Sequence, residues 1–108
     1  MEKVNYDSVS ITNYSLTEVN AEIDNLLSEI HNRIFTSNIS KEERDFLLHN
    51  LQKLSEIASM NDHAQRSLLD SCGLDHSYID DRETARKNAV YQDIDLYREI
   101  SDNEKIFY

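Results

Sequence analysis

Apolar residues recur at helical spacing along most of this chain, and two of the apolar stripes begin directly after a serine-based capping box. In such a box, a serine hydroxyl and a carboxylate three residues later each accept a hydrogen bond from a free backbone N–H at the helix start. Ser15 and Glu18 form the first box, and Ser40 and Glu43 form the second. We therefore expect a first helix over residues 16–35. Its stripe consists of Leu16, Val19, Ile23, Leu26, Leu27, Ile30 and Ile34.

The second stripe predicts the most apolar helix, over residues 40–60. Asp62 and Gln65 form a weaker capping pair, so we favour a break there and a third helix that ends at Gly73. One continuous helix over residues 41–72 remains the alternative, because apolar residues continue on the same face. The break is favoured because uninterrupted helices longer than about 25 residues are uncommon in small domains. The second stripe consists of Phe46, Leu47, Leu48, Leu51, Leu54, Ile57 and Ala58.

The last stripe predicts a fourth helix, from the acidic pair Asp80 and Asp81 to Ile100. Carboxylates in a first turn complement the positive end of the helix dipole. Residues 1–14 are rich in β-branched and aromatic side chains, and we expect either a short strand or a partly ordered arm there. Residues 101–108 are expected to be a tail. The stripe of the fourth helix consists of Ala85, Ala89, Val90, Ile94, Tyr97 and Ile100.

Composition supports this all-α interpretation. The chain has 108 residues, no proline and a single glycine. Antiparallel β domains need frequent turns that recruit glycine and proline, so an all-β fold is excluded. The length suits one domain over residues 1–108. The expected fold is a small antiparallel bundle of three to four helices.

Charge narrows the range of partners. The chain has 21 acidic and 11 basic residues, for a formal charge of -10, and residues 70–108 alone contain ten acidic and five basic ones. Direct nucleic-acid binding is disfavoured, because phosphate contacts need clustered lysine and arginine. An acidic surface keeps a small protein soluble, and it also attracts a basic protein surface. Both explanations of the charge remain open.

Neither a metal site nor a catalytic site has the expected residue spacing. Zinc sites on helices commonly use histidine pairs at i and i+4, and no two of the four histidines have that spacing. Cys72 is the one cysteine, and we expect it to be buried on the apolar row of its helix. We therefore expect no catalytic residues, no metal and no cofactor. The histidines are His31, His49, His63 and His76.

The expected location is the cytoplasm, with no membrane partner. The first residues contain no apolar signal-peptide core. No stretch approaches the roughly 20 apolar residues of a membrane span.

Three functional hypotheses remain. The leading one is a non-enzymatic acidic binding protein, monomeric or homodimeric, that occupies and inhibits a basic protein partner, as immunity proteins, antitoxins and virus-encoded inhibitors do. The alternative is a secretion chaperone or assembly adaptor that binds its client through an apolar groove. The third is an enzyme with a site around His76 and Asp80. For the leading hypothesis, tyrosines among the acids are suitable interface anchors. Its candidate partner-binding residues are Tyr78, Asp80, Asp81, Tyr91, Asp95, Glu99, Phe107 and Tyr108.

Overall fold

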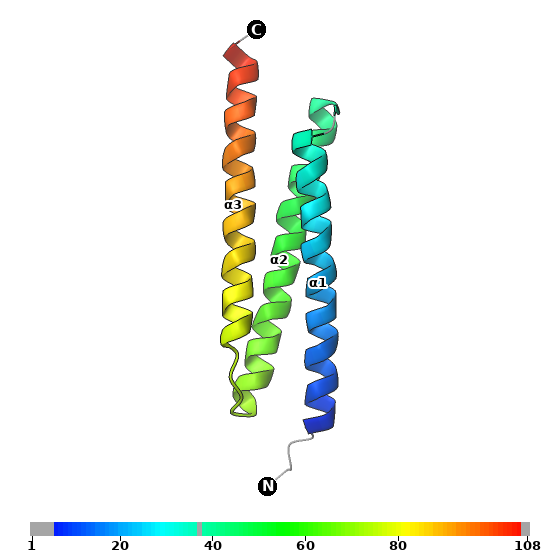
Figure 1. Cartoon of the computed structure of the whole chain (residues 1–108), viewed down its shortest axis with the longest axis vertical. Coiled ribbons are helices and arrows are strands. Elements are labelled where there is room, and N and C mark those ends of the chain that lie inside the picture. The colour runs from blue at the N-terminus through cyan, green and yellow to red at the C-terminus, as the bar shows by residue number, and fades with distance from the viewer. Residues whose placement is uncertain (1–5, 37, 107–108) are drawn as a thin grey trace.

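The described part of the chain forms three long helices in antiparallel succession. The computed structural model describes the backbone of residues 6–36 and 38–106 and the side chains of residues 8–36 and 38–100. The helices are α1 (Tyr6–Thr36), α2 (Lys41–Ser71) and α3 (Ser77–Ile106). They form a narrow bundle of 69 × 18 × 16 Å in which α2 packs against both neighbours. Figure 1 shows the C-terminal end of α3 extending past the connection between α1 and α2. The all-helical prediction is confirmed for the described residues.

The N-terminal boundary of the first helix was predicted wrongly. The described part of the expected arm is helical, since α1 already starts at Tyr6 and Ser15 lies in its interior. Side chains of this segment contact the other helices: the Asn13 side chain and carbonyl bond to Gln65 of α2, and its amide donates to Tyr78 of α3. These tertiary contacts outweigh the local preference of Ser15 for a cap.

The predicted break in the middle of the second helix is also wrong, and the alternative of one continuous helix is confirmed. Helix α2 runs without interruption from Lys41 to Ser71, so the bundle has three helices and no fourth one in the described residues. Asp62 and Gln65 do not cap a helix. Both are completely buried and bond to side chains of α1 and α3.

Both predicted ends of this continuous helix are confirmed. The Ser40 hydroxyl accepts a hydrogen bond from the Glu43 backbone N–H at 3.1 Å. At the other end, Gly73 has φ +70°, which glycine adopts without strain. The N–H groups of Leu74 and Gly73 bond back to the carbonyls of Leu69 and Asp70 at 2.9 and 3.0 Å. This is the Schellman motif, which satisfies free carbonyls at a helix end.

Helix α3 begins three residues earlier than predicted, at Ser77, and Asp80 lies in its first turn. The helix continues to Ile106, so most of the expected tail is helical. Cys72 is half-buried as the C-cap residue of α2, which corrects the expected full burial.

The core lies where the three helices meet. On α1 the buried row differs from the predicted stripe: Ile23, Leu27 and Ile34 are buried, whereas Val19 and Leu26 are 45% and 44% exposed. A wide stripe needs neighbours on both flanks, but α1 packs mainly against α2. The central cluster consists of Ile23, Leu27, Leu51, Ala58 and Val90, with Ile30, Leu54 and Ile94 packed against it.

None of the described helices is apolar over a length sufficient to cross a membrane.

Leu51 and Leu26 provide a matched test of this core. Leu51 is completely buried, so Leu51→Ala should reduce the free energy of unfolding by about 2–5 kcal/mol. Leu26→Ala should cost less than about 1 kcal/mol, because the side chain is half-exposed. Urea denaturation of both variants measures the difference. Equal losses would show that the core is placed wrongly.

Candidate partner-binding surface

A buried ion-pair cluster joins all three helices and determines which face of α3 points outward. Arg86 of α3 donates from Nη1 to the Asp62 carboxylate of α2 at 2.6 Å and from Nε to the Asp24 carboxylate of α1 at 2.7 Å. Arg82, one turn earlier on α3, donates from Nη2 to Asp62 at 2.9 Å. Arg86 is 5% exposed and Asp62 is fully buried. The α3 helix is therefore held by charge-assisted hydrogen bonds in a water-poor interior.

Neutral amides complete this cluster. The Asn20 side-chain amide of α1 donates to Asp62 at 2.7 Å and to the Ala58 carbonyl at 3.2 Å. Gln65 accepts from Arg82 at 2.8 Å and donates to the Thr17 hydroxyl at 2.9 Å. A buried carboxylate is tolerated only when its oxygens are well paired, and here Asp62 accepts from two guanidinium groups and one amide.

Neighbouring charges favour the charged forms of Arg86 within this cluster and of Glu83 beside it. Burial opposes the charge of Arg86, but the carboxylates of Asp24 and Asp62 outweigh it and raise the pKa of its guanidinium. Burial likewise opposes ionisation of Glu83, but Lys87 and Arg66 outweigh it and lower the pKa of that carboxyl. These groups are committed to internal pairs.

Sequence reasoning missed this cluster, although one signal for it was available. Ala58, Asp62, Gln65 and Leu69 follow a four-three-four spacing on the face of α2 that contains Leu51. Polar side chains at core positions of a helix must find partners inside the fold. The capping pattern of Asp62 and Gln65 predicts a helix start instead.

The face of α3 opposite Arg86 contains several of the predicted partner-binding residues. At about 100° per residue, Asp81, Tyr91, Asp95 and Glu99 fall within an arc of about 80° centred opposite Arg86. We call these four residues the outer face of α3. All four are exposed, and Tyr91 is 61% exposed. Among the described side chains, none forms an ion pair with the three acids.

The other predicted residues of this surface lie elsewhere. Asp80 accepts from Arg66 and contacts His76, and its side chain is 48% exposed. Tyr78 is half-exposed, but its hydroxyl bonds to Asn13 of α1 and it does not lie on the outer face. Phe107 and Tyr108 lie outside the described residues.

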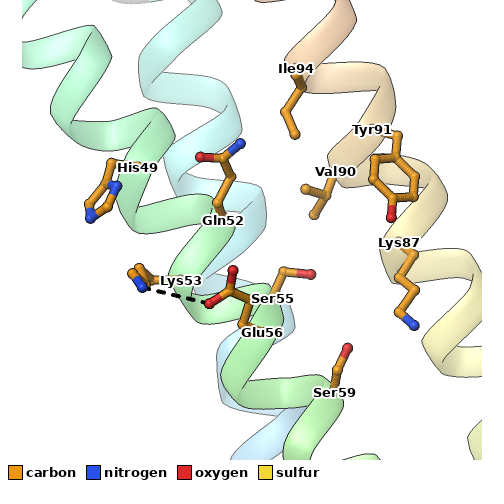
Figure 2. Close-up of a pocket in the computed structure, with 10 residues that line it drawn as sticks. All are labelled: His49, Gln52, Lys53, Ser55, Glu56, Ser59, Lys87, Val90, Tyr91 and Ile94. Atoms are coloured by element: carbon orange, nitrogen blue, oxygen red, sulfur yellow. Dashed lines mark ion pairs between the residues drawn. The ribbon is translucent and has the colours of Figure 1, made fainter.

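A groove of about 560 Å³ lies beside the outer face, between α2 and α3. Figure 2 shows Val90 and Ile94 pointing from α3 toward α2, with Tyr91 and Lys87 beside them. Most residues on the α2 side are polar, and Lys53 pairs with Glu56 at 3.7 Å. A second groove, of about 550 Å³, lies between α1 and α3, where His31 contacts Asp93 at 2.8 Å.

No group of three or more metal-ligating side chains converges in the part of the chain that the structure describes. The histidines lie apart, and those with partners contact carboxylates: His31 contacts Asp93, and His76 contacts Asp70 and Asp80.

Comparison with protein-family models, with curated proteins and with solved structures gave no match.

Removal of the Asp62 charge tests the cluster. Asp62→Asn leaves the buried Arg86 guanidinium without full compensation, so we expect a loss of about 3–5 kcal/mol in the free energy of unfolding. Asp81→Asn makes the same chemical change on the exposed outer face and should alter stability by less than about 0.5 kcal/mol. Thermal and urea unfolding compare the two variants. A similar, small effect of both would contradict the role of the cluster.

Proposed function

We propose that this protein is a non-enzymatic binding protein that uses the outer face of α3 to occupy and inhibit a basic protein partner in the cytoplasm. The observation that supports this proposal is the contrast between two sets of acids. Asp24, Asp62 and Glu83 neutralise internal cations. Asp81, Asp95 and Glu99 are exposed and have no cation among the described side chains. Their charge serves no pairing inside the bundle.

The outer face of α3 combines exposed acids with an exposed tyrosine, as protein interfaces do. Tyr91 lies among these acids and is 61% exposed, and tyrosine is enriched at binding interfaces. The cluster beneath holds α3 in place, so the partner meets a preformed surface and little ordering opposes binding. Negative charge on this face accelerates the encounter with a basic surface. Inhibition follows when the partner's basic cleft is covered. Such occlusion is typical of immunity proteins, antitoxins and virus-encoded inhibitors.

A secretion chaperone or assembly adaptor is the second candidate, and the two grooves beside α3 are the observation that favours it. A client helix would bury its apolar side chains there. The groove between α2 and α3 offers Val90, Tyr91 and Ile94, but its remaining lining is polar. Such a lining suits an apolar client less well than the outer face of α3 suits a basic one.

Charge reversal on the outer face tests the leading proposal. The double variant Asp95→Lys, Glu99→Lys should fold with unchanged stability, because both side chains are exposed and lie away from the helix start. Immobilised wild-type chain should retain a basic protein from a cell extract, and the double variant should lose it. With the purified protein, association should be slower by about tenfold or more for the variant, as expected for lost steering.

The matched control is Glu22→Lys, Glu29→Lys, which makes the same change in net charge at exposed positions of α1. This control should retain the partner. Loss of binding by both double variants would show that the net charge of the protein, and not the outer face of α3, determines partner binding. Full binding by the α3 variant would contradict the proposed surface. Salt-insensitive association would favour the adaptor.

A further inference from the structure

We propose that His76 is a proton-dependent latch that closes the turn between α2 and α3 when it is protonated and loosens this turn when it is neutral. The proposal does not depend on the function proposed above.

The latch consists of one imidazole between two carboxylates. His76 lies directly before the first residue of α3. Its Nε2 lies 2.9 Å from a carboxylate oxygen of Asp70, in the last turn of α2, and its Nδ1 lies 3.1 Å from a carboxylate oxygen of Asp80, in the first turn of α3. The ring therefore connects the end of one helix to the start of the next.

This geometry favours a positive charge on the ring. A neutral imidazole has one N–H donor and one nitrogen lone pair, whereas the imidazolium has two donors. The contact with Asp80 is a hydrogen bond, and both contacts are attractive ion pairs only when both nitrogens are protonated. In the neutral ring, one lone pair faces a carboxylate oxygen, and that contact becomes repulsive.

The aspartates around the ring favour its positive charge, whereas the nearby Arg66 guanidinium opposes it. Asp70 projects from α2, Asp80 from α3, and Asp75 from the turn itself. Arg66 of α2 reaches the other oxygen of Asp80 at 3.4 Å. Helix α1 contributes the uncharged Asn13 at this end of α3. Burial opposes the charge, but the aspartates outweigh it and raise the pKa of His76 above its ordinary value of 6.5.

Because folding raises the pKa of His76, the stability of the turn should decrease as the pH rises. A histidine whose pKa is raised by folding contributes its full stabilisation below the unfolded value, about 6.5. That stabilisation disappears as the pH rises through the folded value, which lies above 6.5. The turn should therefore be closed at pH 6 and should open more often at pH 8.

Amide hydrogen exchange measures this opening directly. The Leu74 N–H bonds to the Leu69 carbonyl at the end of α2, and the Asp80 N–H bonds to the His76 carbonyl in the first turn of α3, so these two N–H groups lie on either side of the turn. Their protection factors, which correct for the intrinsic pH dependence of exchange, should fall between pH 6 and pH 8. The expected fall is roughly two- to fivefold, the range that exposed ion pairs produce. In His76→Gln the factors should be equal at both pH values.

His63→Gln is the matched control. His63 is exposed on α2 and forms no ion pair with a described side chain, so the variant should behave like wild type. Asp70→Asn gives a second test that leaves the ring in place. The pKa of His76, measured by NMR titration, should lie above 6.5 in wild type and move toward 6.5 in this variant. Equal protection factors of wild type at pH 6 and pH 8 would overturn the latch. A fall in the protection factors that persists in His76→Gln would also overturn it, as would a pKa of His76 at or below 6.5 in wild type.

Discussion

The buried Asp62 carboxylate is the constraint on which the rest of this structure depends. It accepts from Arg82 and Arg86 of α3 and from Asn20 of α1. Removing such a group from water costs several kcal/mol unless its oxygens are paired. Three helices must therefore meet at one point with the correct rotation. Apolar packing alone tolerates small rotations of a helix, whereas this set of hydrogen bonds permits few alternatives.

The buried pairs of Asp62 and Arg86 determine which acids of the bundle are exposed. Arg86 points into the bundle, so the opposite side of α3 faces solvent, and the acids there remain outside the internal pairs. Asp24 also pairs with Arg86, which draws α1 toward α3. Glu83, near the start of α3, pairs with both Arg66 and Lys87. These acids thus form two groups: those that pair with cations of the bundle and those that are exposed on the outer face of α3.

Local patterns in the sequence predicted local features well. The Ser40 cap and the Gly73 helix end are satisfied within a few residues, so their partners were visible in the sequence itself. The helical class followed from apolar spacing and from the near absence of glycine and proline. The exposed positions of Asp95 and Glu99 on α3 were also predictable from helical spacing alone.

The remaining features depend on contacts between residues far apart in the chain. Ser15 resembles a cap, but the preceding turns stay helical because Asn13 bonds to α2 and α3. Asp62 and Gln65 resemble a helix start, but their partners are on other helices. The contacts of Asp80 with His76 and Arg66 were not visible in the sequence for the same reason. The spacing of Asp62 and Gln65 indicates burial on the core face of α2, but no local pattern identifies their partners on the other helices.

A double-mutant cycle on the Asp62–Arg86 pair tests the central claim most directly. The variants Asp62→Leu, Arg86→Met and their combination replace the charges by apolar groups of similar size. If the pair is the constraint described here, each single variant leaves a buried charge without full compensation, and the double variant recovers much of the loss. We predict a coupling energy of about 2–3 kcal/mol from urea unfolding at constant pH and salt. Additive losses, with a coupling energy below about 0.5 kcal/mol, would contradict the account.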